Sequence, residues 1–431
     1  MFHFKRALRL AAPAPIRFAH ALRGGGTHAG SPRSLIACGE GIAQTNSLVG
    51  NWLARSAAVA IVAAGLGPAT AQKLDLPKTL TLTAYDTGTS GFNISVAVGK
   101  MFKDKYGTDV RVLPAGNDVA RLAPLRAGRA QASAMGIGIY FAQEGVLEFA
   151  TREWGPQALQ LLLASNDCNG LAMAVAADTG VKGMQDLRGK RVAVVGSPAL
   201  TQNALALLAF GGLSASDVKL VEFASNAAMF KGMLNNEADA AATSTINPLA
   251  REVETSPRGL IWPATPHSDE AGWARLRKIG PYFAKHKATC GAAGLSPAKP
   301  LELPAYPYPL FMGYASLPEG VAYGVTKAMI DGYESYKDGA PGAAGLALMA
   351  QNLSWAVPFH PGAVKALKEA GVWKPEHEAN NQALLKRQSV LAAAWANFLK
   401  SNPPGDKDAL RKAWMSARGE ALKKAGHEPV F

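Results

Sequence analysis

The sequence predicts an α/β protein built from two sheet-based bodies, followed by a helical C-terminal extension. The 431 residues exceed one domain of average length, which is roughly 100 to 200 residues. Segments typical of strands alternate with segments typical of helices as far as residue 317, and the residues after 338 keep a helical period. Such alternation indicates mostly parallel sheets covered by helices on both faces.

The first body contains four expected strands, separated by amphipathic segments of about ten residues. Its apolar runs favour strands, and the segments between them favour helices, because their apolar residues recur every three or four positions. The expected strands are 80–84, 109–113, 130–135 and 159–164, and the expected helices are 96–105, 119–127 and 139–148.

The second body repeats the pattern with strands at 171–176, 192–195, 218–223 and 238–243 and helices at 201–210 and 227–235. A looser, Pro-rich stretch at 296–309 follows it. Two strands, 171–178 and 310–317, bracket this body, and we expect them to form the hinge if they lie side by side. The predicted lobe 1 therefore comprises 72–173 and 311–431, and lobe 2 comprises 174–310.

The N-terminal 71 residues have the composition of a leader. An apolar run at 56–67 follows Arg55 and leads to the small-x-small site Ala69-Thr70-Ala71, which predicts a signal peptide at about 50–71, with Gln72 as the first mature residue. The run is shorter than the roughly 20 residues that span a bilayer. The expected location is the periplasm. The part before Arg55 is too long for a normal charged region and indicates a downstream translation start, with an organellar transit peptide as the alternative.

The net charge of +13 does not indicate a nucleic-acid-binding protein. Seven of the 45 Lys and Arg residues lie in the leader, against one of the 32 acidic residues, so the rest of the chain has a mild positive excess and no long basic run. We interpret this excess as a weak attraction for anions.

Two cysteines, Cys168 and Cys290, lie outside the leader. Export would permit a disulfide between them, a buried free thiol is the alternative, and their spacing does not decide between the two. The sequence has no CxxC pair, and His377-Glu378 lacks the second histidine of a zinc motif. We therefore expect neither a metal nor another cofactor.

Loops rich in Gly, Ser and Thr follow several of the expected strands. Ligands of α/β sheets bind at the carboxyl ends of strands, where Gly admits a close approach, hydroxyls donate hydrogen bonds and helix N-termini attract anions. An ordinary capped turn is the alternative for any one such loop. The candidate ligand-binding residues are Thr87, Gly88, Thr89, Ser90, Gly91, Asn93, Ser95 and Asn117 in lobe 1, facing Ser197, Thr201, Gln202, Thr243, Ser244 and Asn247 in lobe 2.

The sequence also argues against catalysis. The run Gly88-Thr89-Ser90-Gly91-Phe92 misses the nucleophile motif G-x-S-x-G at its last position. His360, which precedes Pro361-Gly362, is expected to order a turn, and no acid and base pair for proton transfer stands out. The prediction is a binding protein and not an enzyme.

Several motifs, in their order along residues 80–373, resemble the TAXI family of solute receptors for tripartite ATP-independent periplasmic (TRAP) transporters. The motifs are Thr87-Gly88-Thr89-Ser90-Gly91, Leu125-Arg126-Ala127-Gly128 with 130–135, Asp186-Leu187-Arg188-Gly189-Lys190-Arg191-Val192, Ala238-Asp239-Ala240-Ala241, Pro318-Glu319 to Lys327, and His360-Pro361-Gly362-Ala363 followed by Glu369-Ala370-Gly371.

This resemblance implies the type II periplasmic binding protein fold, with two lobes joined by two hinge strands that close on a small anionic or zwitterionic solute. It further implies delivery of an amino acid or small organic acid, such as glutamate or 2-oxoglutarate, to the membrane permease subunits of an ion-gradient-driven transporter. The chain departs from the family pattern at Phe92-Asn93-Ile94-Ser95, at Asn117-Asp118 and at Cys290 to Leu295, which leaves the ligand open. The alternatives are the binding component of an ATP-driven (ABC) importer and a sensor-partner binding protein.

Overall fold

The computed structural model describes residues 74–196 and 198–431, apart from the side chains of residues 199 and 200. The predicted leader, its cleavage site and Ser197 lie outside the described residues. Within the described part of the chain, no helix combines the length and the hydropathy that a membrane span requires.

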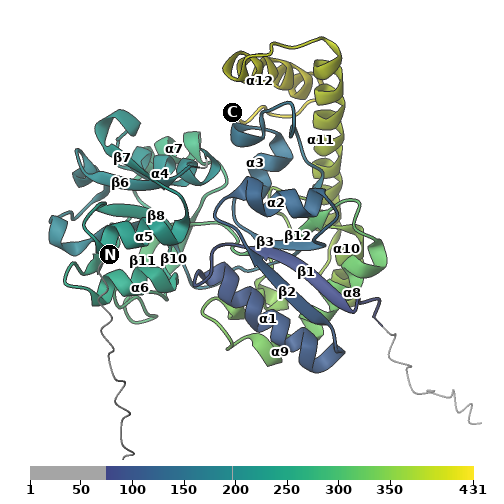
Figure 1. The fold of residues 1–431 in the computed structure, drawn as a ribbon, viewed down its shortest axis with the longest axis horizontal. Coiled ribbons are helices and arrows are strands. Elements are labelled where there is room, and N and C mark those ends of the chain that lie inside the picture. The colour runs from purple at the N-terminus through teal and green to yellow at the C-terminus, as the bar shows by residue number, and fades with distance from the viewer. Residues whose placement is uncertain (1–73, 197) are drawn as a thin grey trace, which may run out of the picture. The chain divides into compact units, whose positions relative to one another are not determined.

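The first sheet has five strands in the order β2-β1-β3-β12-β4 (Figure 1). The strand β1 pairs in parallel with β2 and β3, whereas β12 runs antiparallel to both β3 and β4. The mostly parallel sheet predicted from the sequence is thus a mixed one. The strand bounds are β1 Thr79–Ala84, β2 Asp109–Pro114, β3 Ala132–Met135, β4 Leu159–Ala164 and β12 Leu310–Tyr314.

Helices cover this sheet because each one has an apolar face to bury. In α1, Ile94, Val98, Met101 and Phe102 recur at helical spacing and are buried, and α1 ends at Gly107, whose φ of 69° suits glycine. The helices of this lobe are α1 Ser90–Tyr106, α2 Asp118–Arg126, α3 Gly138–Glu144, α8 Glu319–Asp331, α9 Tyr333–Tyr336 and α10 Pro361–Glu369.

The second sheet repeats the same topology in the order β7-β6-β8-β5-β9. Its strands β6, β7 and β8 are parallel, and β5 runs antiparallel to β8 and β9. An antiparallel pair, β10 and β11, falls partly in the stretch expected to be loose. The bounds are β5 Leu171–Ala176, β6 Arg191–Val195, β7 Lys219–Phe223, β8 Ala240–Ser244, β9 Leu260–Ile261, β10 Ala284–Ala288, β11 Leu301–Ala305, α4 Pro198–Phe210, α5 Asn226–Leu234, α6 Pro248–Thr255 and α7 Glu270–Ile279.

The chain crosses between the two sheets twice, and the two crossings lie side by side. The Tyr308 N–H donates to the Ser165 carbonyl at 2.7 Å, and the Ser165 N–H donates to the Pro309 carbonyl at 2.8 Å. The segments 171–178 and 310–317, proposed as the hinge if they lay side by side, do not meet that condition, because β5 lies within the second sheet and β12 within the first. The adjacent crossings lie a few residues before each of them, at Ser165 and at Tyr308.

The two sheets share one order of strands: β1 lies between β2 and β3 as β6 lies between β7 and β8. An antiparallel strand that follows a crossing separates the third of these from the last strand, β12 between β3 and β4 and β5 between β8 and β9. This shared topology, with two crossings, is the type II periplasmic binding protein fold, as predicted. The helical extension consists of α11 Pro375–Lys400 and α12 Lys407–Lys424. It has its own apolar cluster, in which Trp395, Phe398, Leu410 and Trp414 pack against Ala150 of the first lobe.

Candidate functional site

A cavity lies where the loops at the carboxyl ends of strands in both sheets face each other. Its empty space measures about 710 Å³, including space open to solvent at the mouth. The lining residues come from both lobes. They are Tyr85, Thr89, Ser90, Leu171, Ala172, Ala193, Val194, Val195, Asn203, Ala204, Leu207, Asn226, Met229, Ala242, Thr243, Ser244, Asn247, Phe283, Tyr306 and Tyr308.

Five of the residues predicted from the sequence line this cavity. In lobe 1, Thr89 is the N-cap of α1 and Ser90 is its first residue. In lobe 2, Thr243 and Ser244 end β8, and Asn247 is the N-cap of α6. The structure therefore places these five strand-end and helix-start positions at the cavity, and their contact with a ligand stays a prediction.

The remaining described lobe 1 candidates do not line the cavity. Thr87 is exposed, Gly88 serves a turn with φ of 87°, and Asn93 lies further along α1. The Ser95 hydroxyl donates to the Gly91 carbonyl at 2.8 Å inside α1. A side chain at Gly91 itself would lie 2.9 Å from the Tyr308 hydroxyl, so Gly91 makes room for that tyrosine.

Three further candidates make hydrogen bonds within their own lobes and do not line the cavity. Asn117 is the N-cap of α2, where its side chain accepts from the Ala120 N–H at 2.8 Å. The Thr201 hydroxyl donates to the Val195 carbonyl at 3.2 Å, and the Gln202 amide donates to the Ile279 carbonyl at 3.2 Å. No residue of the Asn117 loop lines the cavity, whereas Asn203 and Ala204, next to Gln202 in α4, do. A helix presents only some of its residues to a neighbouring site.

The aromatic side chains of the cavity were missed by the sequence reasoning. Tyr306 and Tyr308 precede β12 in the second crossing, and Tyr85 directly follows β1. The rings of Tyr85 and Tyr308 contact each other edge to face, 5.9 Å apart. Burial raises the pKa of the Tyr308 hydroxyl, and hydrogen bonds with Ser90 and the Gly91 backbone offset this only in part. The alternating Tyr and Pro at 305–309 was the available signal.

A chain of hydrogen bonds joins the second lobe to the second crossing beside these rings. The Tyr282 hydroxyl donates to the Asn203 carbonyl oxygen at 2.7 Å, and the Asn203 amide donates to the Tyr306 hydroxyl at 3.1 Å. Burial raises the pKa of Tyr306 despite the Asn203 bond, so its hydroxyl stays protonated at neutral pH. Asn203 therefore has a polar partner on each side and a fixed orientation.

Among the described residues that line the cavity, none is charged. The nearest buried charges lie behind Tyr85, where the Arg121 guanidinium sits 3.5 Å from the centre of the ring. Arg121 and Asp118 form an ion pair with both side chains fully buried. Asp118, which the sequence left open as a ligand contact, thus belongs to an internal pair.

One polar atom of the cavity wall has no partner. The side-chain oxygen Oδ1 of Asn226 is buried and makes no hydrogen bond within the described structure. Asn226 is the first residue of α5, next to the N-cap Ser225. An unpaired buried amide is costly, and a bound molecule would relieve that cost.

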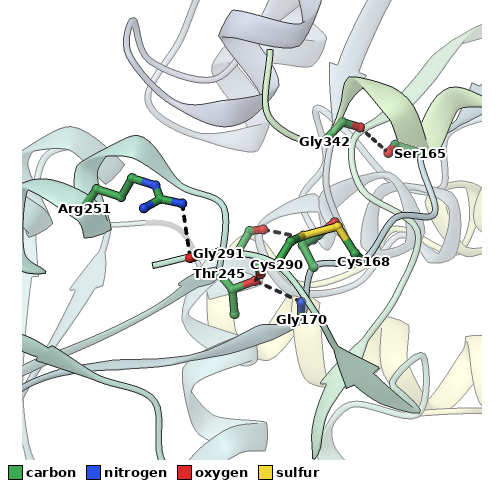
Figure 2. The surroundings of a disulfide bond; sticks show 10 residues. Ser165, Cys168, Gly170, Thr245, Arg251, Cys290, Gly291 and Gly342 are labelled. Carbon is green, nitrogen blue, oxygen red and sulfur yellow. Dashed lines mark hydrogen bonds between the residues drawn. A yellow bond between two sulfur atoms is a disulfide. The ribbon is translucent and has the colours of Figure 1, made fainter. Parts of the chain in front are cut away.

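A disulfide joins Cys168 in the first crossing to Cys290 after β10 (Figure 2). Next to it, Thr245 accepts from the Gly170 N–H at 3.1 Å and donates to the Cys290 carbonyl at 2.8 Å. The Asn169 amide donates to the Ser244 hydroxyl at 3.0 Å. Of the two possibilities left open by the sequence, the structure contains the bridge, and it supports the loop that carries Ser244 and Asn247.

Solved structures with similar folds include an ancestral arginine-binding protein bound to glutamine, with 18% identity over 61% of this chain and 94% of that chain and a TM-score of 0.37. The alkanesulfonate-binding protein SsuA from Xanthomonas axonopodis pv. citri bound to MOPS is 15% identical over 73% and 95%, with a TM-score of 0.37. The periplasmic aliphatic sulphonate binding protein SsuA from Escherichia coli is 12% identical over 79% and 99%, with a TM-score of 0.39.

A comparison of the sequence with curated proteins gives no significant match. The NMT1-like family, by contrast, matches residues 82–371. This range begins within β1, includes all other strands of both sheets and every lining residue of the cavity, and ends before α11. The match does not name the TAXI family that the motifs resemble, so membership of that family stays a prediction. By this match, which extends over more than half of its length, the chain belongs to the NMT1-like family.

Proposed function

We propose that this protein is an extracytoplasmic solute-binding protein. It captures a small organic acid or amino acid between its two lobes and delivers it to a membrane transporter. The observation that carries this proposal is the cavity, whose wall comes from both lobes and whose lobes are joined by two adjacent crossings. Relative movement of two bodies around such a hinge opens and closes a site between them.

The cavity wall supports binding more than catalysis. Its polar groups are hydroxyls and amides, and its apolar part comes from strands and helices of the second lobe and from tyrosine rings, as in sites that fix a ligand by a few directed hydrogen bonds. General acid and base chemistry needs a titratable group within reach of the substrate, and the described wall offers only tyrosines whose pKa is raised by burial.

The test for capture is native mass spectrometry of the protein purified without denaturation. We expect an added small-molecule mass that disappears on unfolding. A Ser90→Ala, Asn247→Ala double variant should lose that mass, whereas Thr87→Ala, at an exposed position outside the cavity, should retain it. Absence of any retained molecule, together with no binding from a panel of organic acids and amino acids in calorimetry, would contradict the proposal.

For the transporter, we propose a TRAP system, on the strength of the ordered motifs from Thr87 to Gly371. The binding component of an ABC importer is the alternative. The neighbouring genes distinguish the two. A large permease gene without an ATPase supports the TRAP system, and a P-loop ATPase gene beside a permease supports the importer. A histidine kinase gene with no permease would instead favour a sensor partner.

A further inference from the structure

We propose that the ligand is an organic monoanion with an apolar body, held by neutral donors without an ion pair. This proposal rests on the proposed function and narrows it, because it excludes dicarboxylates and amino acids as preferred ligands. It follows from the composition of the cavity wall and from the helices that begin there.

Much of the wall can contact only an apolar body. Val194 and Ala242 lie on strands of the second sheet, Leu207 on α4 and Met229 on α5, and Phe283 lies in the loop between α7 and β10. Tyr85 adds a ring surface from the first lobe, and Tyr308 adds one from the second crossing. A ligand with a hydrocarbon chain or a ring would bury its apolar surface against these side chains.

The polar part of the wall suits one negative charge. The helices α1 and α6 both begin at the cavity, and their N-caps Thr89 and Asn247 are neutral. A helix N-terminus attracts an anion, and nearby hydroxyls such as those of Ser90 and Ser244 can donate to an oxyanion. A single carboxylate or sulfonate would be stabilised there without a basic side chain.

A second charge on the ligand would have no partner in this wall. Burying an unpaired carboxylate or ammonium is expensive, and no described lining residue is acidic or basic. The nearby Asp118 is paired with Arg121 behind Tyr85. Asp86 is held at the start of α5, where its Oδ2 accepts from the Ala227 N–H at 3.3 Å. Asp118 pairs through Oδ1 and its buried Oδ2 has no hydrogen-bond partner, but neither Asp118 nor Asp86 lines the cavity.

The test uses calorimetry with the intact protein and two matched series of probes. The first series is hexanoate, adipate, 6-aminohexanoate and hexanamide, and the second is benzoate, terephthalate and benzamide. Within a series the apolar body is similar and the charge differs. We expect the monoanion to bind at least about tenfold more tightly than the dicarboxylate, the zwitterion and the amide.

The outcomes distinguish failure of the monoanion proposal from failure of the proposed function. A preference for adipate, terephthalate or 6-aminohexanoate overturns the monoanion proposal and leaves the proposed function standing. A preference for the amides likewise overturns the monoanion proposal and leaves the proposed function standing. Binding of no probe, together with no solute retained by the purified protein, overturns both proposals. If no probe binds but the purified protein retains a dicarboxylate or an amino acid, only the monoanion proposal is overturned. A retained monoanion supports the monoanion proposal.

A charge variant tests the same point independently. Asn247→Asp keeps the α6 cap, because Asp accepts the Leu249 N–H as Asn247 now does at 3.1 Å, but it adds a negative charge to the wall. The variant also loses the Asn247 donation to the Thr243 hydroxyl, so the readout is the difference between probes. We expect monoanion binding to weaken by about tenfold or more relative to amide binding. Asn352→Asp is the matched control, since Asn352 accepts from the Ser354 N–H at 3.2 Å away from the cavity. Equal loss for anion and amide would overturn the proposal.

Discussion

His360 stabilises a turn by hydrogen bonds of both nitrogens of its ring. Its Nδ1 accepts from the Gly362 N–H at 3.2 Å, which caps α10, and its Nε2 contacts the Leu317 carbonyl at 3.0 Å. An acceptor at Nδ1 and a donor at Nε2 together require the neutral ring. The turn expected at His360 from its Pro and Gly neighbours is confirmed, and the ring is 2% exposed.

Protonation of His360 should therefore destabilise the fold. Burial lowers the pKa of His360 below 6.5, although hydrogen bonds to backbone carbonyls oppose this. The unfolded chain then binds the proton more readily than the folded one, so this contribution to stability is present above about pH 6.5 and falls as the pH drops below it. The variant His360→Asn can still cap α10 but cannot take up this proton. In urea unfolding, its free energy of unfolding should therefore fall less than that of the wild type between about pH 7 and 5.

The control for this prediction is His377→Asn. His377 also accepts a backbone N–H, from Lys374 at 3.1 Å, but it is less buried than His360. This variant should keep the pH dependence of the wild type. If His360→Asn and His377→Asn show the same dependence as the wild type, protonation of His360 does not control stability in this range.

Among the elements, the loop between β8 and α6 depends on the disulfide. Thr245 is held between Gly170 and the Cys290 carbonyl, and the Ala292 N–H donates to the Thr245 carbonyl at 2.9 Å. These bonds join the first crossing, the β8–α6 loop and the residues after β10. The bridge closes a sequence separation of 122 residues.

Removal of the bridge should loosen this loop before the rest of the lobe. For Cys168→Ser with Cys290→Ser, we expect a loss of about 2 to 5 kcal/mol in the free energy of unfolding. Hydrogen exchange at 243–247 should accelerate much more than exchange in β1, which lies in the other sheet and serves as the internal control. Uniform acceleration, or none, would show that the bridge does not order the loop.

The α11 and α12 helices are fixed to α3 by one buried carboxylate. Glu144 accepts from Arg387 Nε at 2.7 Å and from Arg387 Nη2 at 2.8 Å, and it is also paired with Arg418. Burial raises the pKa of Glu144, but the hydrogen bonds and charges of the two arginines outweigh burial and leave it below 4.5. The ionised form is therefore the one that holds the helices.

Glu144→Gln should release these helices, because two largely buried arginines lose their counter-charge. We expect a loss of about 3 to 5 kcal/mol at neutral pH. Because the folded pKa is lowered, the contribution is complete above about pH 4.5 and is lost as the pH falls through the folded value. The difference between wild type and variant in denaturant unfolding should thus shrink in acid. The exposed pair of Lys100 and Asp104 provides the control, since Asp104→Asn should cost little.

At the scale of the whole molecule, Asp86 connects the two lobes directly. It follows β1 in the first lobe, and its carboxylate lies at the N-terminus of α5 in the second, where Ala227 donates to it at 3.3 Å. Gly116 allows this approach, because a side chain there would lie 3.1 Å from the Ser225 Cβ. A carboxylate at a helix N-terminus is stabilised by the hydrogen bond and by the helix dipole.

We expect Asp86→Ala to shift the ligand-free protein towards a more open arrangement. A hydrogen bond to a charged group contributes about 1.5 to 3 kcal/mol, which corresponds to roughly a tenfold or greater change in the balance between closed and open forms. Small-angle X-ray scattering should give a larger radius of gyration for Asp86→Ala than for wild type or for Asp104→Ala. Equal radii for all three proteins would contradict a closing role for Asp86.

Residue patterns along the chain were enough to predict the α/β class, most strands and helices, and several loops near the cavity. Thr89, Ser90, Thr243, Ser244 and Asn247 could be predicted because strand ends and helix caps are encoded locally, by residue period and capping chemistry.

Only the tertiary structure decided which other side chains complete the site. Tyr306 and Tyr308 reach the cavity because the second crossing returns beside Ser165, and Cys168 meets Cys290 across 122 positions. The absence of charge among the described lining residues likewise depends on which faces of α4, α5 and the strands converge. Local propensity fixes where an element begins, whereas long-range packing fixes which of its side chains meet.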